Sequence, residues 1–215
     1  MTRGALKQAL EKADYIAIAR RAASDKRVLS QLFSLTYVAD DRIGWRAVKA
    51  LGLVAAQVAK RDAEFVRGIL RRLMWSLNDE SGGIGWRSPQ AMGAIVAQHP
   101  RLFAEFVPIV VSLFDLDETY LHPGVLWAIG HIAEQDADCV RFALPHVLTC
   151  LADPDSETRG IAAWCLGRLG EPQVSPALKA LLADRATLSV FVDDELVVRT
   201  VSELAQEALV RLEAI

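Results

Sequence analysis

The chain has 215 residues, of which 52% are hydrophobic, and it carries a formal net charge of −3 at pH 7. This length accommodates one extended or one large globular domain with a continuous core, and the slightly negative charge gives no general attraction to nucleic acids or anionic membranes. The apolar runs are short and interrupted by charges, and the N-terminal residues lack the apolar segment of a signal peptide. We therefore expect a cytoplasmic protein that does not contact a membrane.

The N-terminal segment is predicted to contain short helices that close one end of the fold. Residues 2–23 hold two short helical patterns of apolar residues, which suit a cap over an otherwise open core. Ser24 is the expected N-cap of a following helix that extends through Leu35. The acidic pair Asp40-Asp41 then forms the turn into another helix, over about 43–59.

A four-residue string that occurs twice reveals an internal repeat. Ile43-Gly44-Trp45-Arg46 returns as Ile84-Gly85-Trp86-Arg87, and each copy leads to a small residue, an aliphatic residue and a glycine. The same ending recurs in two later helical patterns, so that four glycines mark the period: Gly52, Gly93, Gly130 and Gly167. They lie 41, 37 and 37 residues apart. A fixed period of about 40 residues built on helical patterns predicts an α-solenoid.

Further helix pairs are predicted after the first. The second pair begins near Asp62 and contains a turn-rich loop over 78–83, after which its second helix runs from Trp86 to about Gln98. In the third pair, Pro108 is expected to kink or restart the first helix, because proline removes a backbone hydrogen bond and clashes with the preceding turn.

The C-terminal part departs from the repeat by adding strands. Two runs rich in β-branched residues flank Asp193-Asp194, which predicts a β-hairpin over 188–198. Thr200 and Glu203 have the spacing of a capping box, so a last helix is expected to begin at residue 201 and to continue to about 213.

Residues 153–182 resemble a HEAT repeat of the type found in phycobilisome-lyase HEAT-like proteins. The matching features are Asp153-Pro154, Arg159, Leu169 and the apolar face of the helix between them. The resemblance implies an all-α superhelix of about five helix pairs that spans residues 1–215 as a single domain. The expected units are a cap over 1–23 and repeats over about 24–60, 61–98, 99–136, 137–170 and 171–215. The family mixes scaffolds, lyase subunits and regulators, so it indicates fold more strongly than function.

Each of the four helices that end at a period glycine carries one tryptophan opposite its apolar core arc. These tryptophans are Trp45, Trp86, Trp127 and Trp164. In solenoids of the family that the chain resembles, the inner helices line the concave face, which predicts an aromatic stripe there. Tryptophan supplies a large contact area and one N–H donor, as a binding groove requires. The alternative interpretation is that the four rings pack against neighbouring repeats.

Several polar residues are expected at the edges of this stripe. They are Arg46, Lys49, Arg87, Gln90 and His122. The arginines present a guanidinium fork that suits a carboxylate or a phosphate. The alternative is that they form structural ion pairs with the acidic turn before each helix: Arg46 with Asp40 or Asp41, Arg87 with Asp79 or Glu80, and Arg159 with Asp153 or Asp155. For Arg159 the structural pair is the preferred interpretation.

No metal, cofactor or catalytic constellation is predicted. The four histidines lack paired ligand spacing, and the cysteines Cys139, Cys150 and Cys165 form no C-x-x-C motif. The cysteines lie inside helical patterns, as expected of buried thiols in a reducing compartment.

The sequence therefore favours a noncatalytic scaffold that binds a protein or peptide partner, whose identity it does not specify, on a tryptophan-lined concave face. The hairpin over 188–198 either docks on the partner or caps the C-terminal end of the core. One alternative is a nucleic-acid-binding HEAT-like DNA repair glycosylase, which the negative charge and the lack of a Lys/Arg stripe disfavour. Another is a chromophore lyase subunit, which only the resemblance suggests.

Overall fold

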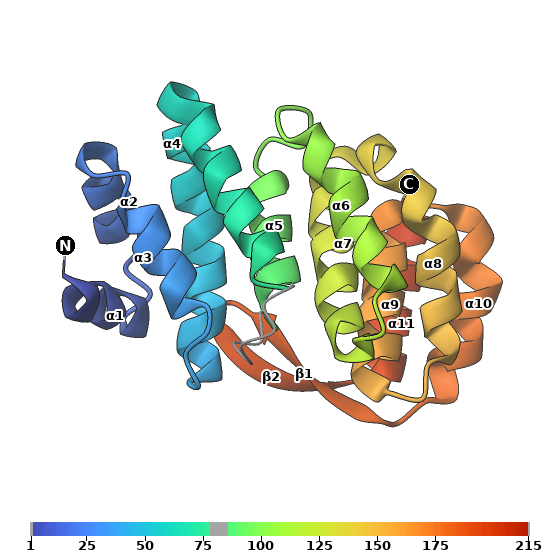
Figure 1. The fold of residues 1–215 in the computed structure, drawn as a ribbon. Coiled ribbons are helices and arrows are strands. Elements are labelled where there is room, and N and C mark those ends of the chain that lie inside the picture. The colour runs from blue at the N-terminus through green and yellow to red at the C-terminus, as the bar shows by residue number, and fades with distance from the viewer. Residues whose placement is uncertain (1, 78–85, 215) are drawn as a thin grey trace.

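The computed structural model describes residues 2–77 and 86–214, and it confirms a mostly helical repeat solenoid. Helices stand side by side from the N-terminus at one end of the array to the C-terminal helices at the other, and a two-stranded hairpin crosses beneath them (Figure 1). Within the described part of the chain, no helix is both long and apolar enough to cross a bilayer. The predicted loop over 78–83 and the first residues of the second repeated string, 84–85, lie outside the described residues.

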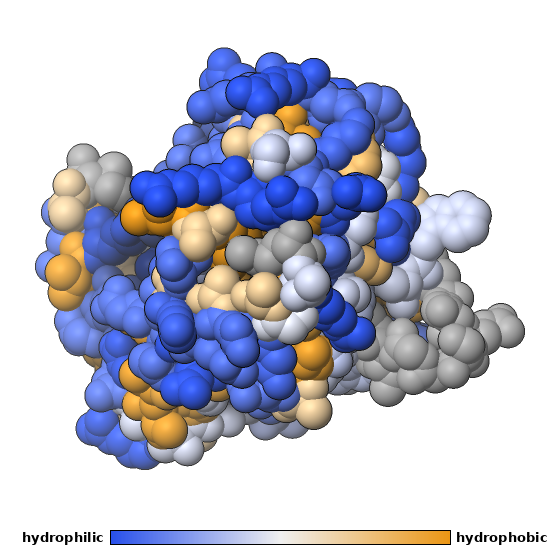
Figure 2. All heavy atoms as spheres, turned by 90° about the vertical axis from the view of Figure 1, so that its left-hand side faces the viewer, coloured by the Kyte–Doolittle hydropathy of each residue, from blue (hydrophilic) through white to orange (hydrophobic). Residues whose placement is uncertain are grey.

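Three short helices form the N-terminal end: α1 (Arg3–Glu11), α2 (Tyr15–Ser24) and α3 (Val28–Leu35). The prediction that Ser24 caps the third helix is wrong. Its hydroxyl donates to the carbonyl oxygen of Arg21, which keeps Ser24 in the last turn of α2. Seen from this end of the solenoid, the surface is mainly hydrophilic with scattered apolar patches (Figure 2), as suits a terminal repeat that shields a core.

The long helix α4 (Asp41–Trp75) consists of two helices joined at a kink. The Asp40 carboxylate accepts the Ile43 N–H and so caps the first half. Asp62 has non-helical φ and ψ of −152° and 73°, and its carboxylate accepts the Phe65 N–H, which starts the second half. A carboxylate that satisfies free N–H groups at a helix start explains both beginnings.

The middle of the chain continues with α5 (Ser88–Val96), α6 (Val107–Ser112), α7 (His122–Asp136), α8 (Leu144–Thr149) and α9 (Ser156–Leu169). Pro108 lies in the first turn of α6, directly after a short 3-10 turn, so the predicted restart is confirmed. Gly170 ends α9 with φ of 72°, a left-handed conformation that glycine adopts without a Cβ clash.

The predicted hairpin is also confirmed. After α10 (Ser175–Ala180), β1 (Thr187–Val192) pairs antiparallel with β2 (Glu195–Thr200). Asp193 and Asp194 both have positive φ, 50° and 69°, as a two-residue turn that matches the twist of the strands requires. The capping box of Thr200 and Glu203 then opens α11 (Val201–Glu213).

The period glycines lie in tight contacts between neighbouring inner helices. A Cβ added to Gly93 on α5 would lie 2.4 Å from the Cα of Ala128 on α7, and one added to Gly130 would lie 2.1 Å from the Trp164 ring on α9. The inner helices therefore pack backbone to backbone or backbone to indole, which leaves no room for a side chain. This packing holds the inner helices, and the tryptophans that they carry, side by side.

Candidate functional site

Three of the four predicted tryptophans come together on the inner helices. The ring centroids of Trp45 and Trp127 lie 5.3 Å apart, and His131 lies between Trp127, at 3.8 Å, and Trp164, at 5.2 Å. The ring of Phe191 from β1 also stacks on Trp45, at 5.6 Å with an interplanar angle of 10°. We call these five residues the aromatic row. It runs across α4, α7 and α9 and ends on the hairpin.

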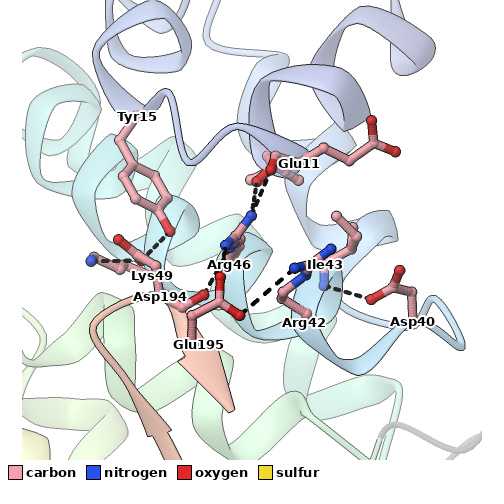
Figure 3. Close-up of polar contacts among 10 residues, drawn as sticks. Glu11, Tyr15, Asp40, Arg42, Ile43, Arg46, Lys49, Asp194 and Glu195 are labelled. Atoms are coloured by element: carbon pink, nitrogen blue, oxygen red, sulfur yellow. Dashed lines mark hydrogen bonds and ion pairs between the residues drawn. The ribbon is translucent and has the colours of Figure 1, made fainter.

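The hairpin reaches this row because its tip is held by the first helices of the chain. Arg46 is only 5% exposed, and its Nη1 donates to the carbonyl oxygens of Leu10 and Glu11 at 3.1 and 2.7 Å. Its remaining N–H groups bind the tip: Nε donates to the Asp194 carbonyl oxygen at 2.9 Å and Nη2 to Glu195 at 2.7 Å. Figure 3 shows the guanidinium between α1 and the hairpin turn.

The Asp194 side chain adds a second set of contacts at the tip. Its Oδ1 accepts hydrogen bonds from the Lys49 ammonium, at 2.8 Å, and from the Tyr15 hydroxyl (Figure 3). Burial alone would raise the pKa of Asp194, but these two hydrogen bonds, together with the positive charges of Lys49 and Arg46, outweigh it and hold the pKa below its ordinary value. Burial and the hydrogen bond to Asp194 both raise the pKa of Tyr15.

The structure therefore corrects the expected ion pair of Arg46. The predicted partners were Asp40 and Asp41 in the preceding turn, but the ion pair forms with Glu195, about 150 residues away in the sequence. Asp40 is occupied as the cap of α4, and the carbonyl oxygens of α1 hold the guanidinium on the opposite side.

Arg87 also forms a buried structural contact. It is 4% exposed, its Nη1 donates to the Thr36 carbonyl oxygen at 2.9 Å, and its Nη2 pairs with Asp41 of the preceding repeat. The predicted partners Asp79 and Glu80 lie outside the described residues. The Arg87 guanidinium carbon lies 4.2 Å from the centroid of the Trp86 ring. Trp86 is 40% exposed and is not part of the aromatic row.

The contacts of Arg159 and the position of His122 also differ from the predictions. Arg159 donates to the main-chain carbonyl oxygens of Asp153 and Pro154 and pairs with the carboxylate of Asp184, at 2.9 Å, instead of with the carboxylates of the preceding turn. His122 is half-buried and packs edge-on against Phe114 at 5.4 Å, away from the aromatic row.

A half-enclosed cavity of about 240 Å³ lies between β1 and the inner helices. Trp45, Trp127, Trp164, His131 and Phe191 supply its aromatic wall. Its polar lining comes from Gln90, Glu157, Arg168, Ser189, Arg199 and Glu207. A second hollow of about 320 Å³ shares Trp127, His131 and Phe191 with the cavity and is bordered by Lys49 and Asp194.

The charged and titratable side chains around the cavity differ in whether they form ion pairs. Arg168 lies 3.8 Å over the Trp164 ring and pairs with Glu134 and Glu207, at 3.3 and 3.5 Å. Loss of solvent and the nearby Arg168 lower the pKa of His131 to about 3, so its ring is neutral at pH 7. Loss of solvent, together with Asp155 and Asp41 nearby, raises the pKa of Glu157.

Sequence reasoning missed several residues of this cavity. Phe191 lay in the predicted hairpin, His131 is one helical turn beyond Trp127, and Glu157 and Arg168 lie on the same helix as Trp164. The i, i+4 spacing of Trp127 with His131 and of Trp164 with Arg168 was a usable signal, because residues four apart share a helix face.

Comparisons with known proteins agree with this architecture. Residues 111–190 match a family model described as HEAT repeats. No curated protein matches the chain.

Among solved structures, an engineered protein is 16% identical with a TM-score of 0.56, over 98% of this chain and 99% of that one. A designed armadillo repeat protein in complex with the peptide (KR)4 is 18% identical with a TM-score of 0.54, over 99% and 100% of the two chains. An archaeal HEAT-like repeats protein from Thermococcus onnurineus NA1 is 16% identical with a TM-score of 0.45, over 100% and 82%. The first two likenesses show the fold, a helical repeat solenoid.

Proposed function

We propose that this chain is a noncatalytic scaffold that binds a protein or peptide partner on its concave face and receives one partner side chain in the cavity beneath the hairpin. The observation that carries the proposal is the aromatic row, in which Trp45, Trp127 and Trp164 remain half-buried around an unfilled space. Half-buried indole rings around a partly open space keep contact area and N–H donors available to a partner.

The size of the cavity favours a side chain over a larger ligand. Its volume of about 240 Å³ is below the roughly 300–1,000 Å³ of sites that bury drug-sized molecules. Partly buried tryptophans arranged around a pocket are the usual anchor points of protein interfaces. The designed armadillo repeat protein of similar fold is in complex with a peptide, so a polypeptide partner is compatible with this architecture.

In this proposal, some of the predicted site residues bind the partner and others stabilise the fold. Trp45, Gln90, Trp127 and Trp164 line the cavity, and Lys49 borders the second hollow. Arg46 and Arg87 are buried and engaged by main-chain carbonyl oxygens, so we assign them to the scaffold. The hairpin crosses the face that an open stripe would occupy, so the partner contacts the rim of the cavity and the hairpin together.

The chemistry of the cavity supports binding over the two alternatives from sequence. His131 is neutral at pH 7 and packed between two indole rings, which suits packing better than proton transfer. Arg168 and Arg199 both form ion pairs with glutamates, which leaves them poorly placed to hold phosphates of a nucleic acid. The phycobilisome-lyase subtype rests only on the sequence resemblance, which is best over residues 153–182 and weaker over the other repeats.

A cavity-filling variant tests the proposal. Ser189 lines the cavity and is exposed, so Ser189→Phe should occupy the space without removing a core contact. Thr187→Phe is the matched control, two residues earlier on the same strand and outside the lining. Partners captured from the native extract by the wild type should be retained by the control and lost from Ser189→Phe. Equal capture by both variants, with melting temperatures unchanged, would refute the cavity as the binding site.

A further inference from the structure

Gln90 shows that the cavity contains an unused hydrogen-bond acceptor. The residue is only 9% exposed and lines the cavity, and its Oε1 is buried without a hydrogen-bond partner among the described residues. Gly124 on α7 makes room for it, because a Cβ there would lie 2.6 Å from that oxygen. A buried hydrogen-bond acceptor that lacks a donor lowers the free energy of unfolding. A ligand that brings an N–H donor would remove this cost.

Glu157 adds a negative charge without a counterion to the same lining. Its carboxylate has no hydrogen bond or ion pair with any residue in 2–77 or 86–214, and its charged neighbours Asp155 and Asp41 are both acidic. Each of these carboxylates makes an added negative charge unfavourable and an added positive charge favourable.

The cations of the lining, by contrast, are already paired. Arg168 contacts Glu134 and Glu207, and Arg199 contacts Glu203 and Glu207, at 3.4 Å for the Arg199–Glu203 pair. An anionic ligand would have to compete with these glutamates for each guanidinium. Among the charged side chains of the lining, Arg168, Arg199 and Glu207 are paired, so the charge that the fold leaves unpaired is the Glu157 carboxylate, and the Gln90 amide oxygen is a further acceptor in the same lining.

The aromatic wall complements these acceptors. The faces of tryptophan and phenylalanine rings carry negative electrostatic potential and attract ammonium and guanidinium groups, most strongly where water is reduced. Arg168 over Trp164 already shows this contact within the cavity. Trp45, Trp127 and Phe191 supply further ring surface to the same space.

We infer that the partner side chain that enters the cavity is a cation, the ammonium of a lysine or the guanidinium of an arginine. It lies against the aromatic row, pairs with Glu157 and donates to the Gln90 amide oxygen. This inference rests on the proposed function and specifies the chemistry of its ligand. Because the Glu157 contact is a charge-assisted hydrogen bond, its loss should weaken binding about tenfold.

The test uses capped single amino acids as probes: Nα-acetyl-lysine methylamide, the arginine analogue, and the norleucine analogue as an uncharged control of similar shape. Binding is followed through the indole N–H signals of the five tryptophans in nitrogen-15 spectra. The lysine and arginine probes should shift the signals of Trp45, Trp127 and Trp164, while that of Trp75, which is 74% exposed and far along α4, stays unchanged. Glu157→Gln should weaken the lysine probe about tenfold, and its spectrum shows directly whether the variant is folded.

Other outcomes separate this inference from the proposed function. If the norleucine probe shifts the same three signals equally, or if Glu157→Gln binds lysine unchanged, the cation assignment is wrong while the concave site stands. If no probe shifts any of the three signals, the inference is overturned, and partner capture with Ser189→Phe then decides the proposed function independently.

Discussion

At the scale of single residues, Arg46 carries the contact between the hairpin and the N-terminal helices. Replacing it by methionine keeps the apolar stem but removes the Arg46 hydrogen bonds to the Leu10 and Glu11 carbonyl oxygens, of which Leu10 retains the Ala13 N–H, and the pair with Glu195. We expect the free energy of unfolding to fall by about 3 kcal/mol, as measured by urea denaturation. Arg42→Met is the control, because Arg42 is half exposed and contacts Glu195 only at 3.7 Å. A loss of under 0.5 kcal/mol, about the limit for a surface change, in both variants would contradict this role.

The period glycines allow a second prediction at this scale. Gly93→Ala places a Cβ 2.4 Å from the backbone of Ala128, so α5 and α7 must move apart, and we expect a loss of about 1–3 kcal/mol. Gly68→Ala has no atom within 4 Å of the new Cβ and lies inside α4, so it should stabilise by about 0.5–1 kcal/mol. Thermal unfolding of the two variants checks the pair, and the same sign for both would refute the explanation.

The sequence predicts the position of a side chain well where the helical period alone determines which face of a helix it occupies. Trp45, Trp127 and Trp164 lie within helices, so their positions relative to the core arc follow from the helical turn. The predicted position of Trp86 in the aromatic stripe was wrong. It assumed that Trp86 lies in a helix, but α5 begins only at Ser88. The predicted partners of Arg46 and Arg159 were wrong. Their actual partners, Glu195 and Asp184, lie in the hairpin and in the turn before it, and no local sequence pattern specifies where these segments pack.

At the scale of elements, the hairpin determines the shape of the candidate site. Its existence and its turn were predictable from two β-branched runs and an Asp-Asp pair. Its position was not, since Phe191 and Asp194 contact residues about 145 positions earlier in the chain. Neither sequence interpretation, a cap over the C-terminal core or a free docking strand, included a hairpin seated on the chain's own aromatic row.

The anchor of the hairpin tip should depend on pH through Asp194. Its pKa in the folded state lies below the ordinary value of 3.8. The stabilisation is therefore complete above that ordinary value and is lost as the pH falls through the lower folded-state pKa. We expect the difference in unfolding free energy between wild type and Asp194→Asn to be constant near neutral pH and to shrink as the pH falls below about 4. Urea denaturation at several pH values measures it, and a difference that grows on acidification would contradict the assignment.

At the scale of the whole molecule, the hairpin contacts helices that are not its neighbours along the solenoid. Repeats usually contact only their neighbours, so end repeats unfold more easily than the middle. Here the hairpin turn bonds to Tyr15 at the start of α2 and to Arg46 and Lys49 in the first half of α4, and Arg46 in turn bonds to α1. The repeat pattern predicted the array of helices, while the contact of the hairpin with the aromatic row and the N-terminal helices became visible only in three dimensions.

These contacts of the hairpin predict an effect of hairpin changes on distant helices. Phe191→Ala removes the ring that stacks on Trp45 and should cost about 2 kcal/mol, less than a fully buried phenylalanine because the residue is half-buried. Hydrogen exchange should then speed up in α1 and α2 as well as in the hairpin. Val198→Ala, at a position that is 73% exposed on the partner strand, should change neither. Faster exchange confined to the hairpin would show that the N-terminal helices are stable without it.

The most direct measurement of partner binding at the aromatic row follows the indole N–H signals while a captured partner is added to the wild-type protein. We expect the signals of Trp45, Trp127 and Trp164 to shift together, because these three rings line the cavity, and that of Trp75 not to respond. Shifts at Trp75 or Trp86 with the three cavity signals unchanged would place the binding surface elsewhere and contradict binding at the aromatic row.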